Sequence, residues 1–168
     1  MTQPQMAVLA ALAVLAGAWD WKWRLIPNWL TVTGVAAGLL LHSPLAAMKG
    51  IGLALLVYLP LYLLRTAGGG DLKLMAAVGS VAGPDVWLVL FVLSAVLGGV
   101  AALILAASKR RLRRTLSNVG HILGSAVRAE APHARRAELD IADPGALTLP
   151  RGTVIAAATL LYLGVQWL

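Results

Sequence analysis

The sequence predicts an all-α, polytopic membrane protein with about six transmembrane helices plus an amphipathic helix at the cytoplasmic face. Of its 168 residues, 60% are hydrophobic and only 12% are charged, and the mean hydropathy is +0.81. A soluble domain of this size is less apolar, and several uncharged runs are long enough to cross a bilayer as helices. We therefore expect residues 1–168 to form a single membrane-embedded domain.

Breaks between the apolar runs predict where the helices end. The first run stops at Asp20, and Ile26-Pro27-Asn28 then interrupts the chain. Pro27 disfavours a helical residue before it, and Asn28 is a good N-cap for the helix that follows. Gly83-Pro84-Asp85 is expected to form a later turn. The helices expected from these breaks span residues 4–20, 29–41, 46–64, 71–82, 86–107 and 153–168.

Residues 108–148 form the one long polar segment. The segment opens with a run of basic residues and continues with an apolar stripe at helical spacing, made of Leu112, Leu116, Val119, Leu123 and Val127. A basic helix with one apolar face is typical of a helix lying in the headgroup plane. We therefore expect a basic cytoplasmic loop that carries an amphipathic helix.

The distribution of charge predicts the topology. Net charge is +7, and 13 of the 14 Lys and Arg residues, all but Lys49, lie in or beside the loops after the first, third and fifth helices. Those loops share one side of the membrane, and basic loops are typical of the cytoplasmic side, where they face anionic lipid headgroups. We expect no nucleic-acid partner. Cysteine is absent and the three histidines are scattered, so we expect no metal site.

Two acids beside this side of the membrane stand out as a candidate pair. Asp20 borders the first helix, and Asp71 follows three glycines at the start of the fourth. One carboxylate of such a pair, ionised, can activate a water as general base, while the other, protonated, donates to a carbonyl oxygen. Peptide hydrolysis by this route needs no metal, cofactor or covalent intermediate. The glycines, Gly68 and Gly70 among them, allow close approach of a backbone or a substrate.

Each acid also has a purely structural interpretation. Asp71 has the position of an N-cap or first-turn acid favoured by the helix dipole. Asp20 has the position of an interfacial acid that pairs with Lys22 or Arg24, an interaction usually worth little. For either acid alone these interpretations are the more common ones, so the argument for a site rests on the two acids together.

The joint pattern around the two acids resembles that of the type IV prepilin peptidases, the GxGD intramembrane aspartyl proteases. The stretch from Asp20 through Ile26-Pro27-Asn28 to Thr31 is similar to the family's first motif, an Asp followed by basic residues and then I-P-N-x-L-T. Gly68-Gly69-Gly70-Asp71-Leu72-Lys73-Leu74 is similar to the second motif, G-x-G-D-x-K-L. A weaker likeness is Leu149-Pro150-Arg151-Gly152 to I-P-[FY]-G, with Arg151 in place of the aromatic residue.

The resemblance implies a multi-pass peptidase of the bacterial inner membrane with its active site towards the cytoplasm. It implies that Asp20 and Asp71 are catalytic, and that Gly68, Gly70, Lys73, Pro27 and Asn28 are motif or substrate-binding positions. The implied substrates are prepilins or pseudopilins of type IV pilus and secretion systems, which lose a basic leader peptide. We expect the two carboxylates to face a cavity between the first and fourth helices.

The chain departs from the larger, bifunctional members of that family. Those carry paired C-x-x-C motifs and methylate the new N-terminus with S-adenosylmethionine, whereas this sequence has no Cys. It is similar to the small, protease-only type found with tight-adherence (Tad/Flp) pili, so we expect no cofactor and no methylation. Two other functions stay open from the residues: a non-catalytic scaffold of a pilus or secretion assembly, and a small ion-coupled carrier, since intramembrane acids also mark ion paths.

Overall fold

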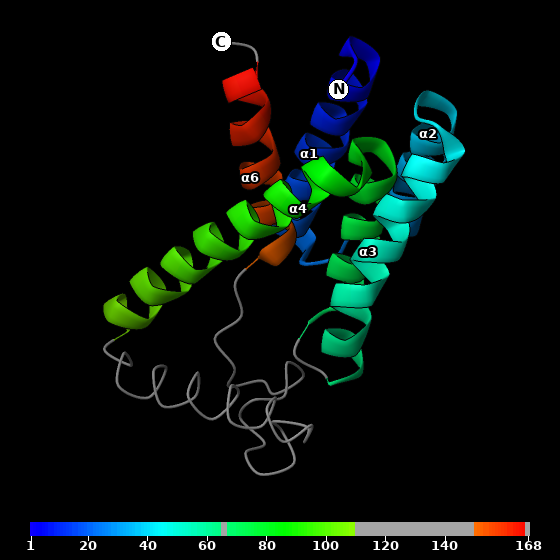
Figure 1. Ribbon diagram of the computed structural model, residues 1–168. Helices are drawn as coiled ribbons and strands as arrows, with labels where there is room; N and C mark the ends of the chain where they lie inside the picture. Colours follow the sequence, from blue (N-terminus) through cyan, green and yellow to red (C-terminus); the bar gives the residue numbers. More distant parts are fainter. Residues whose placement is uncertain (65–66, 110–149, 167–168) are drawn as a thin grey trace.

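The computed structural model describes residues 1–64, 67–109 and 150–166, and these form helices joined by short connections (Figure 1). The described part of the chain contains no strand, which agrees with the predicted all-α class. The predicted loop and amphipathic helix of residues 108–148 lie almost entirely outside the described residues. The helices are α1 (Gln3–Trp23), α2 (Asn28–Leu41), α3 (Pro44–Leu63), α4 (Gly69–Ser108) and α6 (Arg151–Gln166).

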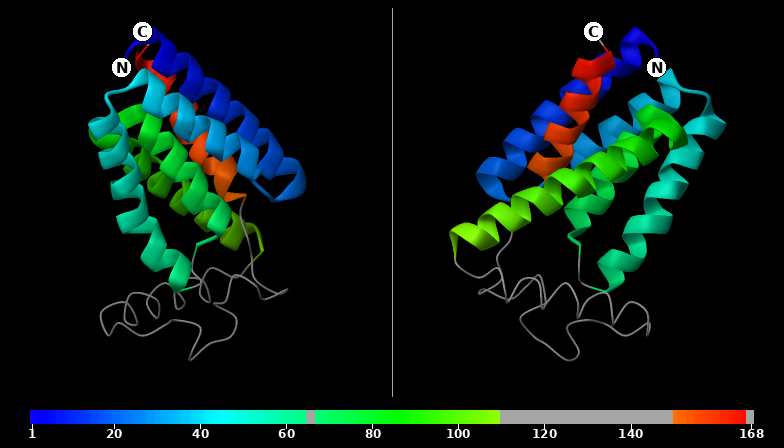
Figure 2. Two further views of the ribbon diagram at one scale, coloured as in Figure 1. Left: turned by 90° about the vertical axis from the view of Figure 1, so that its right-hand side faces the viewer. Right: turned by 60° about the vertical axis from the view of Figure 1, so that its left-hand side comes forward.

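The helix α4 contains both the fourth and the fifth predicted helices. Gly83 interrupts it with φ 77° and ψ 171°, a backbone conformation that glycine adopts without a steric penalty, and Pro84 follows. The two parts, which we call the first segment (residues 69–82) and the second segment (residues 84–108), run up to this bend and back again (Figures 1 and 2). The predicted turn at Gly83-Pro84-Asp85 is therefore a sharp bend within one continuous helical element.

Trp87 holds the two segments of α4 together beyond the bend. Its side chain is fully buried, and its indole N–H donates to the backbone carbonyl of Met75 at 3.0 Å. Its ring stacks on Phe91, with centroids 5.4 Å apart, and Phe91 in turn meets the ring of Tyr58 on α3 edge-on at 6.0 Å. This aromatic group sets the position of α3 against α4.

Small residues allow the helices to pack closely around the first segment of α4. On α2, Gly34 lies against Ala77, where a Cβ would come within 3.1 Å, and Gly38 lies directly on Ser80. On α3, Gly50 lies against the backbone of Gly79. Without a hydrophobic driving force between helices, close packing of this kind is a main source of helix association in membranes. The first segment of α4 is consequently the central element of the bundle.

Three helices are long and apolar enough to span a membrane, namely α1, α3 and α4, and α2 is a shorter apolar helix. Large apolar side chains such as Leu40, Leu56 and Val32 lie exposed on the outside of the bundle, as expected where lipid covers the surface. The structure thus agrees with a membrane protein, while the expected count of about six spans is not confirmed.

One end of the bundle collects most of the described basic residues. The last turn of α1, the starts of α2, α4 and α6, and the ends of α3 and α4 all lie at this end, opposite the two termini (Figures 1 and 2). We call it the basic end. Its described basic residues are Lys22, Arg24, Lys73, Lys109 and Arg151, and Lys49 lies near the start of α3 at the opposite end.

Candidate active site

Asp20 lies in the last turn of α1. The predicted helix ends at Asp20, whereas α1 continues for three more residues, to Trp23. Its side chain is buried, with 7% of the residue exposed. Its Oδ2 accepts a hydrogen bond from the backbone N–H of Thr153 at 3.0 Å and one from the Thr153 hydroxyl at 3.4 Å. Thr153 is in the first turn of α6, where backbone N–H groups have no partner within the helix. The start of α6 therefore holds the carboxylate of Asp20.

Gly152 makes this contact between α6 and α1 feasible. A Cβ at Gly152 would lie 3.0 Å from both Cβ and Cγ of Asp20 and 2.9 Å from Cδ1 of Ile26. Any larger residue at position 152 would thus have to displace the side chain of Asp20 or that of Ile26. Ile26, the first residue of the Ile-Pro-Asn break, is itself buried.

Asp71 is the third residue of α4, and 8% of it is exposed. Its Oδ2 accepts a hydrogen bond from the backbone N–H of Gly68 at 3.3 Å. The structural interpretation of Asp71 as a first-turn acid is therefore correct for its local contacts. That role leaves its second oxygen, Oδ1, with no hydrogen-bond partner among the described residues, and the same holds for Oδ1 of Asp20.

Ile26 links the surroundings of the two acids. A Cβ at Gly70, the residue before Asp71, would lie 3.6 Å from the Ile26 side chain, which also lies against Gly152 beside Asp20. The fold therefore brings the two acids, from the last turn of α1 and the first turn of α4, into one region at the basic end.

Two further motif residues contact each other rather than the acids. The Lys73 ammonium donates to Oδ1 of Asn28 at 2.9 Å. The predicted N-cap is wrong by one residue, because Pro27 occupies the N-cap position and Asn28 is the first residue of α2. The Asn28 side chain is therefore available to Lys73, and this hydrogen bond connects the starts of α2 and α4.

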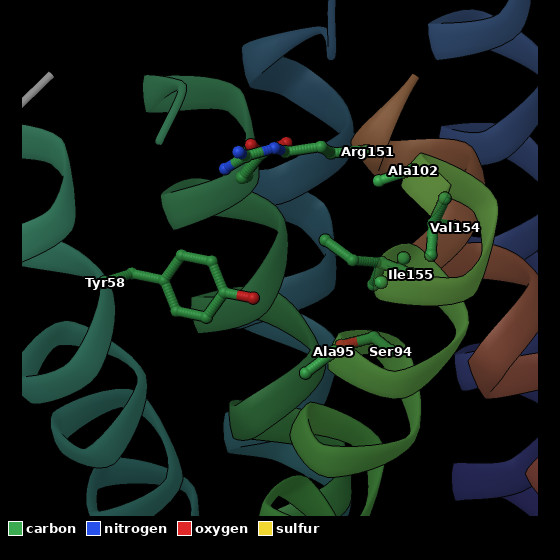
Figure 3. A pocket seen from close by; sticks show the side chains of 10 residues that line it. Tyr58, Ser94, Ala95, Ala102, Arg151, Val154 and Ile155 are labelled. Atoms are coloured by element: carbon green, nitrogen blue, oxygen red, sulfur yellow. The ribbon is translucent and has the colours of Figure 1, made fainter. Parts of the chain in front are cut away.

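A cavity of about 330 Å³ opens beside Asp71. It lies between α3, the second segment of α4 and α6 (Figure 3), whereas we expected a cavity between α1 and the start of α4. Asp20 is not among its lining residues, whereas Arg151 lines it together with Asp71. The lining is formed by Tyr58, Asp71, Ser94, Ala95, Gly98, Gly99, Ala102, Arg151, Val154 and Ile155.

Sequence reasoning missed Thr153, Tyr58 and Ser94. No motif or spacing marks these hydroxyl residues in a sequence that contains many others. In the sequence, Arg151 stands out only because it replaces an aromatic residue of the family's motif, and no pattern there indicates that it lines the same cavity as Asp71. The weak likeness at residues 149–152 did indicate the right region, since Gly152 packs on Asp20.

The arrangement can support acid–base chemistry on a peptide bond. Two buried carboxyl groups at helix ends each have one oxygen fixed by a backbone N–H and one oxygen available for another partner. Such a pair can orient a water on one side and a carbonyl oxygen on the other. A catalytic carboxyl group works best when its own position is fixed in this way.

Comparison with known proteins places the chain in a family. The family model of the type IV leader peptidase family matches residues 7–103, which is more than half of the chain and includes both aspartates. No curated protein and no solved structure matches the sequence. The family match begins in α1 and ends in the second segment of α4, so α6 lies outside it. The chain therefore belongs to the type IV leader peptidase family.

Proposed function

We propose that this leader peptidase-type protease is an intramembrane aspartyl endopeptidase that removes the basic leader of prepilins or pseudopilins. The observation that carries the proposal is the common location of Asp20 and Asp71. Both are more than nine-tenths buried, both lie at the basic end, and each has one oxygen without a hydrogen-bond partner in the described part of the chain. Buried acids in a membrane protein are costly and are usually kept for function.

The proposed reaction is a direct hydrolysis. One aspartate, ionised, takes a proton from a water, and the resulting hydroxide attacks the scissile carbonyl carbon. The other aspartate, protonated, donates its proton to the carbonyl oxygen, which gives a neutral gem-diol intermediate. Collapse of the intermediate breaks the C–N bond, the nitrogen leaves as an amine after receiving a proton, and no cofactor takes part.

The basic end supports cleavage at the cytoplasmic face. Basic residues flanking membrane helices are a feature of cytoplasmic loops, which also face anionic headgroups. The candidate acids border that end, so a leader that stays in the cytoplasm would meet them without crossing the bilayer. The absence of Cys from the sequence supports the protease-only type of tight-adherence pilus systems, which does not methylate its product.

Leader removal from a candidate prepilin tests the proposal. The purified protein, reconstituted in lipid, should shorten a prepilin from the same genome, as seen by gel shift, and mass spectrometry should find an unmethylated new N-terminus. Asp20→Asn and Asp71→Asn should each lower the rate by at least about 100-fold, since each removes one half of the acid–base pair.

Asp85→Asn is the matched control for these two variants. Asp85 is the remaining acid of the described residues, and it lies exposed at the bend of α4, far along the helix from Asp71. Its variant should cleave at the wild-type rate. An intact prepilin after incubation with the wild-type protein would favour a non-catalytic scaffold, and near-normal cleavage by either site variant would remove that aspartate from the mechanism.

A further inference from the structure

The cavity beside Asp71 has a floor of small residues on the second segment of α4. Ala95, Gly98, Gly99 and Ala102 recur at helical spacing and share one face of the helix. A Cβ at Gly99 would have nothing within 4 Å, and one at Gly98 would meet only Val154 at 3.6 Å. These glycines therefore border open space and are not required for contact between helices.

Polar groups line the wall of the same cavity. Tyr58 projects into it from α3 and is 9% exposed, and the buried Ser94 lines it from the second segment of α4 (Figure 3). Asp71 adds a buried carboxylate whose Oδ1 has no hydrogen-bond partner among the residues that the structure describes. Buried polar atoms in proteins nearly always have a partner. The free oxygen of Asp71 can therefore accept a hydrogen bond from a water or a ligand in this cavity.

The cavity reaches the apolar outside of the bundle. Ala95 and Gly99 are exposed, and so are the large apolar side chains beside them, Val92, Val96 and Val100. At the other side of the cavity, the Arg151 side chain extends across it from the start of α6 (Figure 3). The opening near Ala95 and Gly99 suits an apolar group that enters from the bilayer. The positive charge of the Arg151 guanidinium disfavours the binding of a basic group in the cavity.

We infer that this cavity binds the apolar segment of the substrate that follows the scissile bond. This inference rests on the proposed function. The substrate backbone lies against Gly98 and Gly99, where the missing side chains allow close approach. The cavity volume of about 330 Å³ is at the lower end of the roughly 300–1,000 Å³ usual for ligand pockets. The basic leader stays outside, on the other side of Asp71, because Arg151 repels it.

Filling the cavity at Gly99 tests the inference. Gly99→Leu should raise the KM for the candidate prepilin about tenfold or more, since even a methylene or two changes the fit of an apolar pocket by that order. Gly52→Leu is the matched control: a Cβ at Gly52 also has nothing within 4 Å, and Gly52 on α3 does not line the cavity. Its KM should stay within about twofold of wild type.

Photo-crosslinking provides a readout that does not depend on cleavage. A photo-reactive amino acid replaces Gly99, or Gly52 as control, in the Asp71→Asn background, and the same prepilin is added. Position 99 should form an adduct that mass spectrometry maps to the apolar segment, and position 52 should form none.

The outcomes separate this inference from the proposed function. An unchanged KM for Gly99→Leu, or adducts on the basic leader, would contradict the proposed binding of the apolar segment in this cavity. Cleavage by the wild-type protein would still support the proposed peptidase activity. No cleavage by the wild-type protein would overturn both. If the Gly99→Leu protein does not fold, the crosslinking experiment alone decides whether the substrate's apolar segment binds in this cavity.

Discussion

The carboxylates of Asp20 and Asp71 each lie at the N-terminus of a helix. For Asp71 this is the helix that contains it, whereas for Asp20 it is a different helix. Asp71 is in the first turn of its own helix, α4, and receives an N–H from Gly68, three residues earlier. Asp20 is at the C-terminal end of α1 and receives an N–H from Thr153 in the first turn of α6. Both contacts use backbone donors that a helix leaves unpaired, with a dipole that favours negative charge.

This difference makes one half of the site local and the other half dependent on tertiary packing. The contact of Asp71 exists as soon as α4 forms its first turn. The contact of Asp20 exists only after α6 has packed against α1, and residues 109–150 separate α6 from α4 in the chain. In a membrane protein helices form first and then associate. The docking of α6 therefore completes the surroundings of the proposed site.

The largest contrast is expected from lengthening each side chain. Asp20→Glu should lower kcat by about 100-fold, because Thr153, Gly152 and Ile26 enclose the carboxylate and a shift of about 1 Å can cost that much. Asp71→Glu should cost clearly less, because Asp71 lines a cavity that can accept another methylene. Single-turnover cleavage of the prepilin measures both, and equal losses would contradict the comparison.

A smaller effect is expected from Gly152→Ala. The added methyl would lie 3.0 Å from Asp20 and must displace it, so we expect kcat to fall by about tenfold. Gly164→Ala, on the same helix, is its control, because a Cβ at Gly164 has nothing within 4 Å. If cleavage rates of the two variants match, Gly152 does not set the position of Asp20.

The Thr153 hydroxyl should matter less than its backbone. Thr153→Val keeps the N–H that binds Asp20 and removes a hydroxyl that donates either to Asp20 at 3.4 Å or to the Gly17 carbonyl at 3.2 Å. One such hydrogen bond is worth about 1 kcal/mol, so we expect kcat to fall by about fivefold with little change in KM. Thr153→Ser should restore the rate. An unchanged rate in the valine variant would show that the hydroxyl does not matter, and a loss in the serine variant as large as in the valine variant would show that the effect is not specific to the hydroxyl.

The smallest effect is expected at the contact between the two motifs. Lys73 and Asn28 form an exposed hydrogen bond, which should be worth no more than about 1 kcal/mol. A double-mutant cycle of Lys73→Met and Asn28→Ala, measured as the free energy of unfolding in detergent, should give a coupling energy of this size. Cleavage should change by less than about threefold. A loss of cleavage by more than tenfold, with stability unchanged, would instead assign Lys73 or Asn28 to substrate binding.

The sequence alone determined the helical membrane class and the break at Gly83-Pro84. These features are local, because chain length, hydropathy and the conformations open to glycine and proline act within a few residues. The first-turn position of Asp71 also followed from its neighbours, for the same reason. The helix ends were predicted less well: α1 continues three residues past Asp20, and the N-cap of α2 is Pro27.

Only the tertiary structure decided what surrounds Asp20 and what lies next to Asp71. Thr153 reaches Asp20 because α6 packs on α1. Tyr58 and Ser94 line one cavity because Phe91, stacked on Trp87, packs against Tyr58 and so positions α3 beside the second segment of α4. Contacts of this kind join residues far apart in the chain, so no local pattern records them. Close packing of small residues sets the distances between helices, and the hydrogen-bond partners and the cavity follow from those distances.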